Sequence, residues 1–300
     1  MTNTTTFMAP IENEENTDTK IAFASAWLSS NELFHLLKRQ TPSSKGCWKS
    51  LQGVDSQEDA DVIVVLGNVN GYKNEKPIVH IREEPDKIGN FRPIEGATVV
   101  DYNDFHAVTW WIGNSYDELV NMEYQKKPKA FSTVCSNKWK HRSDFIEKVG
   151  LIVPAFEVYG PDEGWGSGIS SRVSERQYKG PLDGFHGSLD NRQRSQKQRG
   201  LKDYTWSLAI ENSLQRNYFT EKIIDCMLLW SKPIYWGCPN IGDFFPRDSF
   251  LQIELDDSGL RAIIEAVFTP LSQSEIMALK EARRLILDEY NIWEVVHRAL

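Results

Sequence analysis

Short apolar segments alternate with polar or amphipathic ones along most of the chain. In the first 125 residues, apolar runs predict strands at residues 20–25 (KIAFAS), 61–67 (DVIVVLG), 77–81 (PIVHI) and 98–101 (TVVD). The second of these is apolar throughout, as expected of a parallel strand that is covered on both faces. An apolar stripe predicts a helix over residues 31–40 and consists of Leu33, Phe34, Leu36 and Leu37. Strands that alternate with helices or polar spacers indicate an α/β layered fold.

A polar break at residues 124–129 (YQKKPK) predicts a linker, after which the alternation begins again. The predicted strands are residues 130–135, 156–159, 204–210, 233–236 and 250–255, and the predicted helical segments are residues 137–149, 219–230, 257–267 and 272–300. Between them, residues 160–200 are rich in Gly, Ser, Arg and Gln and predict a loop. We therefore expect two α/β domains, residues 20–125 and 126–300, after a polar, disordered tail at residues 1–19.

The charge balance bears on the class of partner. The formal net charge is −8, which argues against general nucleic-acid binding because that function needs a basic surface. Five basic residues nevertheless lie close together in the sequence, and we interpret them as a solvated loop: Arg192, Arg194, Lys197, Arg199 and Lys202.

Cysteine spacing and the N-terminal sequence indicate the compartment. The four cysteines, at positions 47, 135, 226 and 238, form no C-x-x-C pair, and this usage fits a reducing environment. No run of about 18 apolar residues predicts a membrane span. The first 20 residues have neither a basic start nor an apolar stretch of signal-peptide length. We expect a soluble, cytoplasmic protein.

No motif predicts a metal site. Asp59 and Asp61 have D-x-D spacing, but they precede a predicted strand, whereas metal-binding carboxylates of this kind usually follow one. The sequence also lacks H-E-x-x-H, and its six histidines are scattered.

The segment from Glu211 to Lys222 carries the clearest chemistry, because it joins a predicted strand to a predicted helix. Ligands of open α/β sheets bind at the carboxyl ends of strands, and a helix N-terminus favours phosphate. Lys222 adds a cation there, and Glu221 could accept hydrogen bonds from sugar hydroxyls. The segment therefore predicts a cradle for a nucleotide diphosphate. The alternative is a capped helix start, in which Thr220 caps, Glu221 suits the helix dipole and Lys222 points to solvent.

Residues 207–245 (SLAIENSLQRNYFTEKIIDCMLLWSKPIYWGCPNIGDFF) resemble the donor-binding signature of the α-1,3/α-1,4-fucosyltransferases, glycosyltransferase family 10. The pattern is an apolar strand, E-N-S/T, a Tyr, T-E-K, a helix and P-I-Y-W-G-x-P. Two shorter stretches agree: residues 134–145 (VCSNKWKHRSDF) resemble the family's S-N-x-R helix start, and residues 156–160 (FEVYG) resemble its strand ending in V-Y-G.

The resemblance implies a GT-B-type fold, with two facing Rossmann-like domains and a C-terminal helix, in which the C-terminal domain holds GDP-fucose. Arg142 and Lys222 would hold the diphosphate, and Glu221 would bind ribose or fucose hydroxyls. Asn212 and Tyr218 would line the pocket. The family inverts the sugar carbon by a single displacement, in which fixed cations can replace a metal. The resemblance thus implies GDP-fucose as co-substrate, with no further cofactor.

A single displacement needs a general base near the acceptor. Residues 81–85 (IREEP) follow a predicted strand and resemble the family's short E-x-P motif. Glu83 matches that motif best and Glu84 second, so we take both as candidate catalytic residues. The alternative is that both are solvated loop charges.

The leading hypothesis is therefore fucosyl transfer from GDP-fucose to a hydroxyl of a glycan acceptor. One alternative is the same scaffold with a different GDP-sugar, and another is a nucleotide-sugar-binding protein without transfer activity. Trp110 and Trp111 could stack on an acceptor sugar or pack in the core. The C-terminal helix, which contains Trp293 and Val296, could return to the N-terminal domain.

Overall fold

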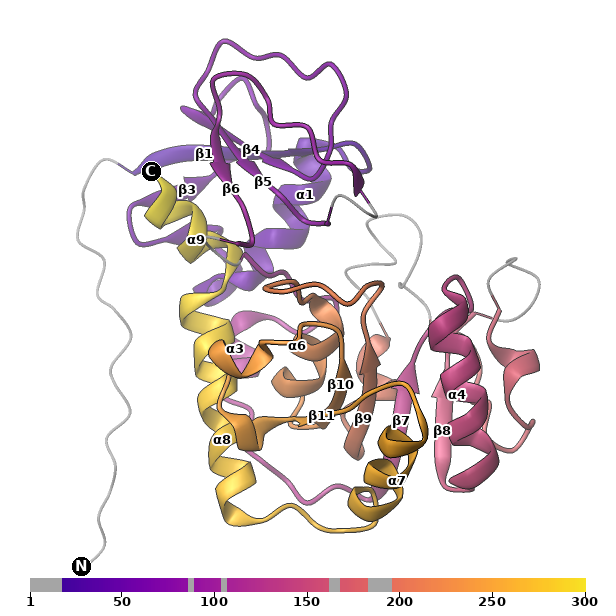
Figure 1. The fold of residues 1–300 in the computed structure, drawn as a ribbon. Coiled ribbons are helices and arrows are strands. Elements are labelled where there is room, and N and C mark those ends of the chain that lie inside the picture. The colour runs from indigo at the N-terminus through magenta and orange to yellow at the C-terminus, as the bar shows by residue number, and fades with distance from the viewer. Residues whose placement is uncertain (1–17, 86–88, 104–106, 162–167, 183–195) are drawn as a thin grey trace, which may run out of the picture.

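The computed structural model describes residues 18–85, 89–103, 107–161, 168–182 and 196–300. It consists of two sheets, one above the other in the view of Figure 1. Residues 1–17 of the predicted tail lie outside the described residues, as do Arg192 and Arg194 of the predicted basic loop. In the part of the chain that is described, no helix combines the length and the apolar composition that crossing a bilayer requires.

The first sheet has six strands in the order β2-β3-β1-β4-β5-β6. Their bounds are Thr19–Ser25 (β1), Cys47–Trp48 (β2), Leu51–Gly53 (β3), Val62–Leu66 (β4), Ile78–Ile81 (β5) and Thr98–Val100 (β6). All pairs are parallel except the β2–β3 hairpin, which the hydrophobic pattern did not predict. Every residue of β4 and β5 is buried, as a sheet covered on both faces requires. Helix α1 (Ser30–Leu37) begins at the capping box of Ser29 and Glu32.

The second sheet has five parallel strands in the order β11-β10-β9-β7-β8. Their bounds are Lys129–Val134 (β7), Phe156–Tyr159 (β8), Tyr204–Ile210 (β9), Lys232–Trp236 (β10) and Leu251–Gln252 (β11). The predicted strand at residues 250–255 thus pairs over only two residues. Helices α6 (Glu221–Leu228) and α8 (Gln273–Arg284) pack on one face, and α4 (Lys140–Ile152) and α7 (Asp257–Ala266) pack on the other.

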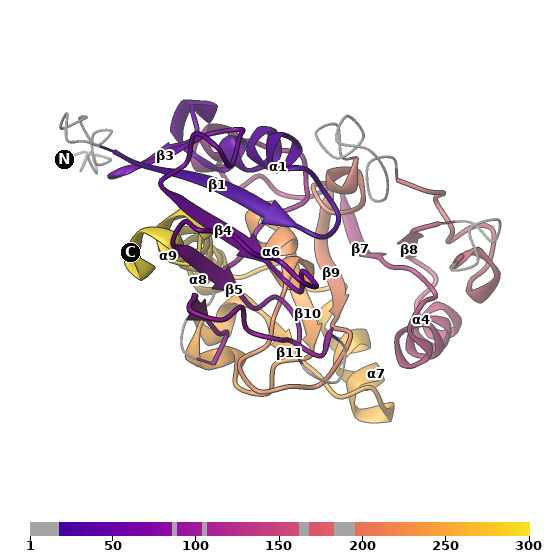
Figure 2. The ribbon, with the colours of Figure 1, turned by 90° about the horizontal axis from the view of Figure 1, so that it is seen from above.

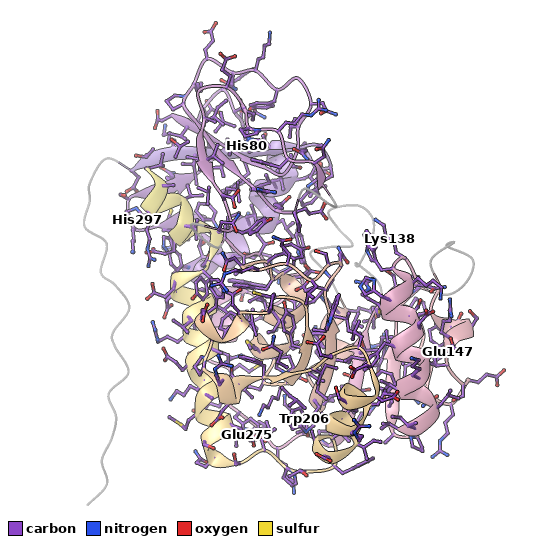
Figure 3. The ribbon with its side chains drawn as sticks, in the orientation of Figure 1. His80, Lys138, Glu147, Trp206, Glu275 and His297 are labelled. Atoms are coloured by element: carbon purple, nitrogen blue, oxygen red, sulfur yellow. The ribbon has the colours of Figure 1, made fainter. Side chains whose placement is uncertain are left out.

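The carboxyl ends of the second sheet face the first sheet. Lys138, just after β7, lies on the side toward the first sheet, whereas Trp206 near the start of β9 and Glu275 of α8 lie at the far end (Figure 3). We call the first sheet with α1 and α9 the first lobe, and the second sheet with α4, α6, α7 and α8 the second lobe.

Helix α9 (Ile292–Ala299) belongs to the core of the first lobe although it follows the second lobe in sequence. The fully buried Trp293 contacts Phe23 edge-on at 5.2 Å and donates from Nε1 to the carbonyl of Leu37 at 2.9 Å. Figure 1 and Figure 2 both show α9 against the strands of the first sheet. Asn291 fixes the start of α9. Its side-chain oxygen accepts a hydrogen bond from Trp293 N, and its side-chain nitrogen donates to the Gln40 carbonyl.

The segment between the two sheets, in contrast, packs against the second lobe although it precedes the strands of that lobe in sequence. Val108, Trp110, Ile112 and Leu119, the last in helix α3 (Tyr116–Val120), are buried in the main cluster of the second lobe. The chain therefore crosses between the lobes twice, and each lobe contains residues from both sides of position 125.

Candidate active site

The loop after β9 is built around a buried carboxylate. Glu211 is fully buried, and its carboxylate accepts hydrogen bonds from the backbone N and the hydroxyl of Thr220, both at 2.8 Å. Thr220 in turn caps α6 by accepting from Lys222 N. The helix start is therefore held by the strand end, which fixes the first turn of α6 relative to the sheet.

Thr220 caps the helix, but Lys222 does not point to solvent as the capped-helix alternative expects. Its Nζ lies 3.4 Å from Glu211 Oε2 and 3.2 Å from Glu221 Oε1, and its side chain is 17% exposed. Burial alone would raise the pKa of Glu221, but the charges of Lys222 and Lys197 outweigh it and lower that pKa to about 2. Glu221 is thus ionised at neutral pH.

Arg142 and Asn212 lie together, as the resemblance implies. Arg142, in the first turn of α4, donates to Asn212 Oδ1 at 3.0 Å and to Ser136 Oγ at 3.1 Å. Arg142 Nε and Ser213 Oγ are buried and have no hydrogen-bond partner among the described residues. A buried donor without a partner is costly.

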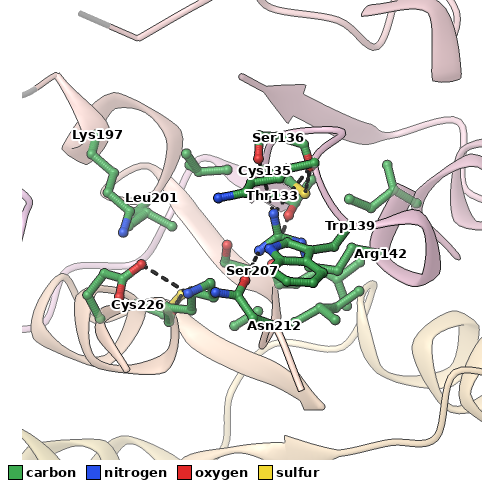
Figure 4. Close-up of a pocket in the computed structure, with 18 residues that line it drawn as sticks. Thr133, Cys135, Ser136, Trp139, Arg142, Lys197, Leu201, Ser207, Asn212 and Cys226 are labelled. Atoms are coloured by element: carbon green, nitrogen blue, oxygen red, sulfur yellow. Dashed lines mark hydrogen bonds and ion pairs between the residues drawn. The ribbon is translucent and has the colours of Figure 1, made fainter. Parts of the chain in front are cut away.

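These side chains line a cavity of about 200 Å³ at the carboxyl ends of β7 and β9 (Figure 4). Its polar lining includes Arg142, Asn212, Glu221 and Lys222, and Val134, Ile146 and Leu201 form part of its apolar wall. This is the position at which open α/β sheets bind ligands.

Lys197 also lines this cavity, so our interpretation of it as part of a solvated loop is wrong. Its side chain is 4% exposed, and its Nζ lies 2.6 Å from Asp225 Oδ2. The reason is that residues 197–200 form a turn that packs on β7, where Ser132 Oγ donates to the Gly200 carbonyl. Arg199 and Lys202 are exposed, as that interpretation expects.

A second cavity, of about 290 Å³, lies between the lobes and shares Asn212, Glu221 and Lys222 with the first. Tyr218 closes it on the second-lobe side and contacts Tyr102 of the first lobe, ring to ring, at 5.9 Å. The remaining first-lobe wall includes Arg82, Glu83 and Glu84. All seven candidate site residues therefore line one of two adjoining cavities.

Glu83 and Glu84 differ in environment. Glu83 is half-buried and its Oε2 lies only 2.8 Å from where a Cβ of Gly67 would stand, so the glycine makes room for the carboxylate. Burial, with the charges of Glu84 and Glu221, raises the pKa of Glu83 to about 7. Glu84 is exposed. Glu83 is thus no solvated loop charge, and its environment suits a general base at neutral pH.

The two adjacent tryptophans separate. Trp110 is buried in the core, where its Nε1 donates to the Asn114 carbonyl at 2.9 Å. Trp111 is half-buried, lines the cleft between the lobes and contacts Trp27 edge-on at 5.9 Å. Within the described ranges, no cluster of three His, Cys, Asp or Glu side chains is arranged to hold a metal ion.

Residues 124–259 match the family model described as glycosyltransferase family 10 (fucosyltransferase), C-terminal part. Through this domain, which takes up a little under half of the chain, the protein is similar to glycosyltransferase family 10. The family 10 match includes Arg142, Asn212, Tyr218, Glu221 and Lys222, whereas Glu83 and Glu84 lie outside it.

Two family relatives share parts of this domain. The chain is 40% identical over 75 residues to a putative fucosyltransferase-like protein of Arabidopsis thaliana. The matched segment covers 24% of this chain and 15% of that protein. It is 39% identical over 57 residues to an α-(1,3)-fucosyltransferase of Helicobacter pylori. This matched segment covers 19% of this chain and 12% of that enzyme. The matched segments are thus a small part of both relatives.

The fold similarity extends further than the sequence similarity. A crystal structure of an α1,3-fucosyltransferase aligns with a TM-score of 0.50 and 18% identity, covering 95% of this chain and 85% of that one. This alignment confirms the GT-B fold that the resemblance implies, with two facing α/β lobes.

Proposed function

We propose that this protein is a glycosyltransferase that moves fucose from GDP-fucose to a hydroxyl of a glycan, with inversion at the sugar carbon. One observation carries the proposal: Glu83, with a pKa of about 7, and the Arg142–Lys222 cation pair line adjoining cavities from opposite lobes. A base on one side and cations on the other are what a single displacement with an anionic leaving group needs.

The second lobe would bind the donor. Arg142 and Lys222, which both line the donor cavity, hold the diphosphate. Glu221, ionised because its pKa is about 2, accepts hydrogen bonds from ribose or fucose hydroxyls. Asn212 lines both the donor cavity and the cleft, and the buried Tyr218 lines the cleft.

The reaction would proceed across the cleft. The acceptor hydroxyl attacks the anomeric carbon of fucose while Glu83 takes the hydroxyl proton. The bond from that carbon to the diphosphate oxygen breaks, and its electron pair leaves with GDP. Arg142 and Lys222 stabilise the charge that develops on the diphosphate. In this single displacement the acceptor oxygen attacks the face of the anomeric carbon opposite the diphosphate, and the configuration is therefore inverted.

The first lobe would bind the acceptor. A third cavity, of about 360 Å³, joins the cleft at Glu83 and Glu84 and is lined by Trp27 and Phe91. Aromatic faces suit the apolar face of a pyranose, and carboxylates accept hydrogen bonds from its hydroxyls. A sugar in this cavity would present a hydroxyl next to Glu83.

Calorimetric titration with GDP, GDP-fucose, GDP-mannose and UDP-glucose tests the donor site. We expect the wild-type protein to bind GDP and GDP-fucose, and Arg142→Met to weaken both by at least about tenfold, since a charge-assisted hydrogen bond is lost. Lys140→Met, an exposed cation two residues earlier on α4, is the matched control and should bind as the wild type does.

Each other outcome points elsewhere. Equal or tighter binding of GDP-mannose would indicate a donor GDP-sugar other than GDP-fucose. Binding of GDP-fucose without GDP release in the presence of lactose, N-acetylglucosamine or N-acetyllactosamine would favour a binding protein without transfer activity. No binding of any GDP compound would overturn the proposal.

A further inference from the structure

The buried pair of Lys197 and Asp225 is not used by the donor site as described above. The side chains are 4% and 0% exposed, and the ammonium lies 2.6 Å from the carboxylate. A buried ion pair contributes little net stability, because the desolvation of both charges offsets their attraction, and apolar residues of similar size often replace such pairs without loss. Stability alone therefore gives a weak reason for placing this pair in the interior.

The pair stands at the donor cavity. Lys197 lines that cavity together with Arg142 and Lys222. Its charge reaches the ligand-facing side chains, because it is one of the causes that lower the pKa of Glu221. Figure 4 shows Lys197 and Arg142 on opposite sides of the cavity, so basic side chains stand on both sides of the space between them.

Asp225 fixes Lys197 at this position. It lies on α6 one turn after Glu221 and Lys222, on the buried side of the helix. While Oδ2 binds Lys197, Oδ1 accepts a hydrogen bond from the backbone N of Trp111 at 3.1 Å. Both carboxylate oxygens are thus engaged, and the ammonium of Lys197 is held by a carboxylate whose other oxygen is fixed by the backbone of Trp111.

We propose that Lys197 is a third cation of the donor site, which binds the diphosphate of a nucleoside diphosphate sugar, and that Asp225 is its positioning residue. This inference rests on the proposed function, since it names a further ligand contact in the same cavity. Arg142 of α4 and Lys222 of α6 are the other two cations, and Lys197 would approach the diphosphate from the side opposite Arg142.

The test compares GDP with guanosine, which has the same base and ribose but no charge. In the variant Lys197→Met/Asp225→Asn both charges are removed, and the amide oxygen of the introduced asparagine still accepts from Trp111 N. We expect the Kd for GDP to rise by at least about tenfold and the Kd for guanosine to change by less than about twofold. Lys202→Met, an exposed cation of the same segment, is the control and should leave both values unchanged.

Lys197→Arg keeps the charge and the ion pair, so it should retain GDP binding even if the double variant folds poorly. Wild-type affinity for GDP in the double variant would show that the pair is structural and would overturn the inference. Equal losses for GDP and guanosine would also overturn it, because the effect would then not depend on phosphate. If the wild-type protein itself bound no GDP, this result would contradict the proposed function, and the inference about Lys197 with it.

Discussion

Glu83 and Glu221 face one another across the cleft, one from each lobe, and the charge of Glu221 is among the causes that raise the pKa of Glu83. Both charged neighbours that shift the pKa of Glu83, Glu84 and Glu221, are negative. Lys222 and Lys197, in contrast, stabilise the ionised form of Glu221. The two carboxyl groups therefore have pKa values of about 7 and about 2. Such a separation is what the proposed tasks require, proton transfer for Glu83 and hydrogen-bond acceptance for Glu221.

The first prediction concerns the pH dependence of transfer. Only the deprotonated form of Glu83 can accept a proton, so kcat/KM should fall about tenfold per pH unit below an apparent pKa of about 7. Glu83→Gln should lower kcat by at least about a hundredfold and leave GDP affinity unchanged. The measurement is initial-rate kinetics from pH 5 to 9.

Glu84→Gln is the matched control, since Glu84 is exposed and adjacent. It should retain most of the activity and shift the acid limb slightly downward, because one negative neighbour of Glu83 is removed. The reverse result, with Glu84→Gln inactive and Glu83→Gln active, would assign the base to Glu84.

The second prediction concerns stability. The folded-state pKa of Glu83, about 7, lies above its ordinary value of 4.5. The folded protein therefore binds this proton more tightly than the unfolded chain, and the contribution of Glu83 to stability is lost as pH rises from 4.5 to 7. Glu83→Gln should be more stable than the wild type at pH 8, by up to about 3 kcal/mol, and no more stable at pH 4. Urea unfolding of both proteins at the two pH values measures this, and a difference that does not change with pH would contradict it.

The third prediction concerns the glycine of the P-I-Y-W-G segment. A Cβ at Gly237 would stand 2.3 Å from Glu211 Cγ and 2.6 Å from the Tyr235 hydroxyl. Gly237→Ala should thus displace Glu211, which holds Thr220 and Lys222. It should lower the unfolding free energy by about 1–3 kcal/mol. GDP binding should weaken in the same variant.

Gly71→Ala is a useful comparison, since no atom lies within 4 Å of a Cβ there and only the positive φ of 68° is affected. It should leave GDP binding intact. A Gly237→Ala protein that bound GDP normally would separate Glu211 from the donor site.

The fourth prediction concerns α9. Trp293→Ala should lower the unfolding free energy by about 3–5 kcal/mol, because it removes a fully buried ring and its hydrogen bond to Leu37. Leu300→Ala, at the end of the same helix and 55% exposed, should change it by about 0.5 kcal/mol or less. Denaturant titration of both variants tests whether α9 stabilises the first lobe.

The hydrophobic pattern was sufficient for the main elements. Strands such as β4 and β9 are long, apolar and bounded by polar residues, so their signal is local. The hairpin of β2 and β3 has no such signal, because its strands are two and three residues long. Likewise, the turn between α8 and α9 depends on Asn291 reaching Gln40, a contact across 251 positions that local sequence cannot reveal.

The candidate site divides in the same way. Residues that share one short motif, such as Glu221 and Lys222, could be chosen as candidates from sequence, and their place after a strand end is confirmed. Lys197 could not, because its neighbours in sequence are polar and its burial depends on Asp225, 28 positions later. The distinction between Glu83 and Glu84 likewise needed the structure, since only the packing against Gly67 shows which carboxylate is desolvated.

The return of α9 has a consequence for biosynthesis. One apolar face of the first sheet is covered by α9, which is synthesised about 190 residues after the last strand of that sheet. As the chain leaves the ribosome, the strands of the first sheet emerge early but must wait, with Phe23 and Leu37 uncovered, until Trp293 has been added. The second sheet has all its strands before then, so the lobe that is translated second is the first that can complete its core, and the exposed interval is when this protein would most need a chaperone.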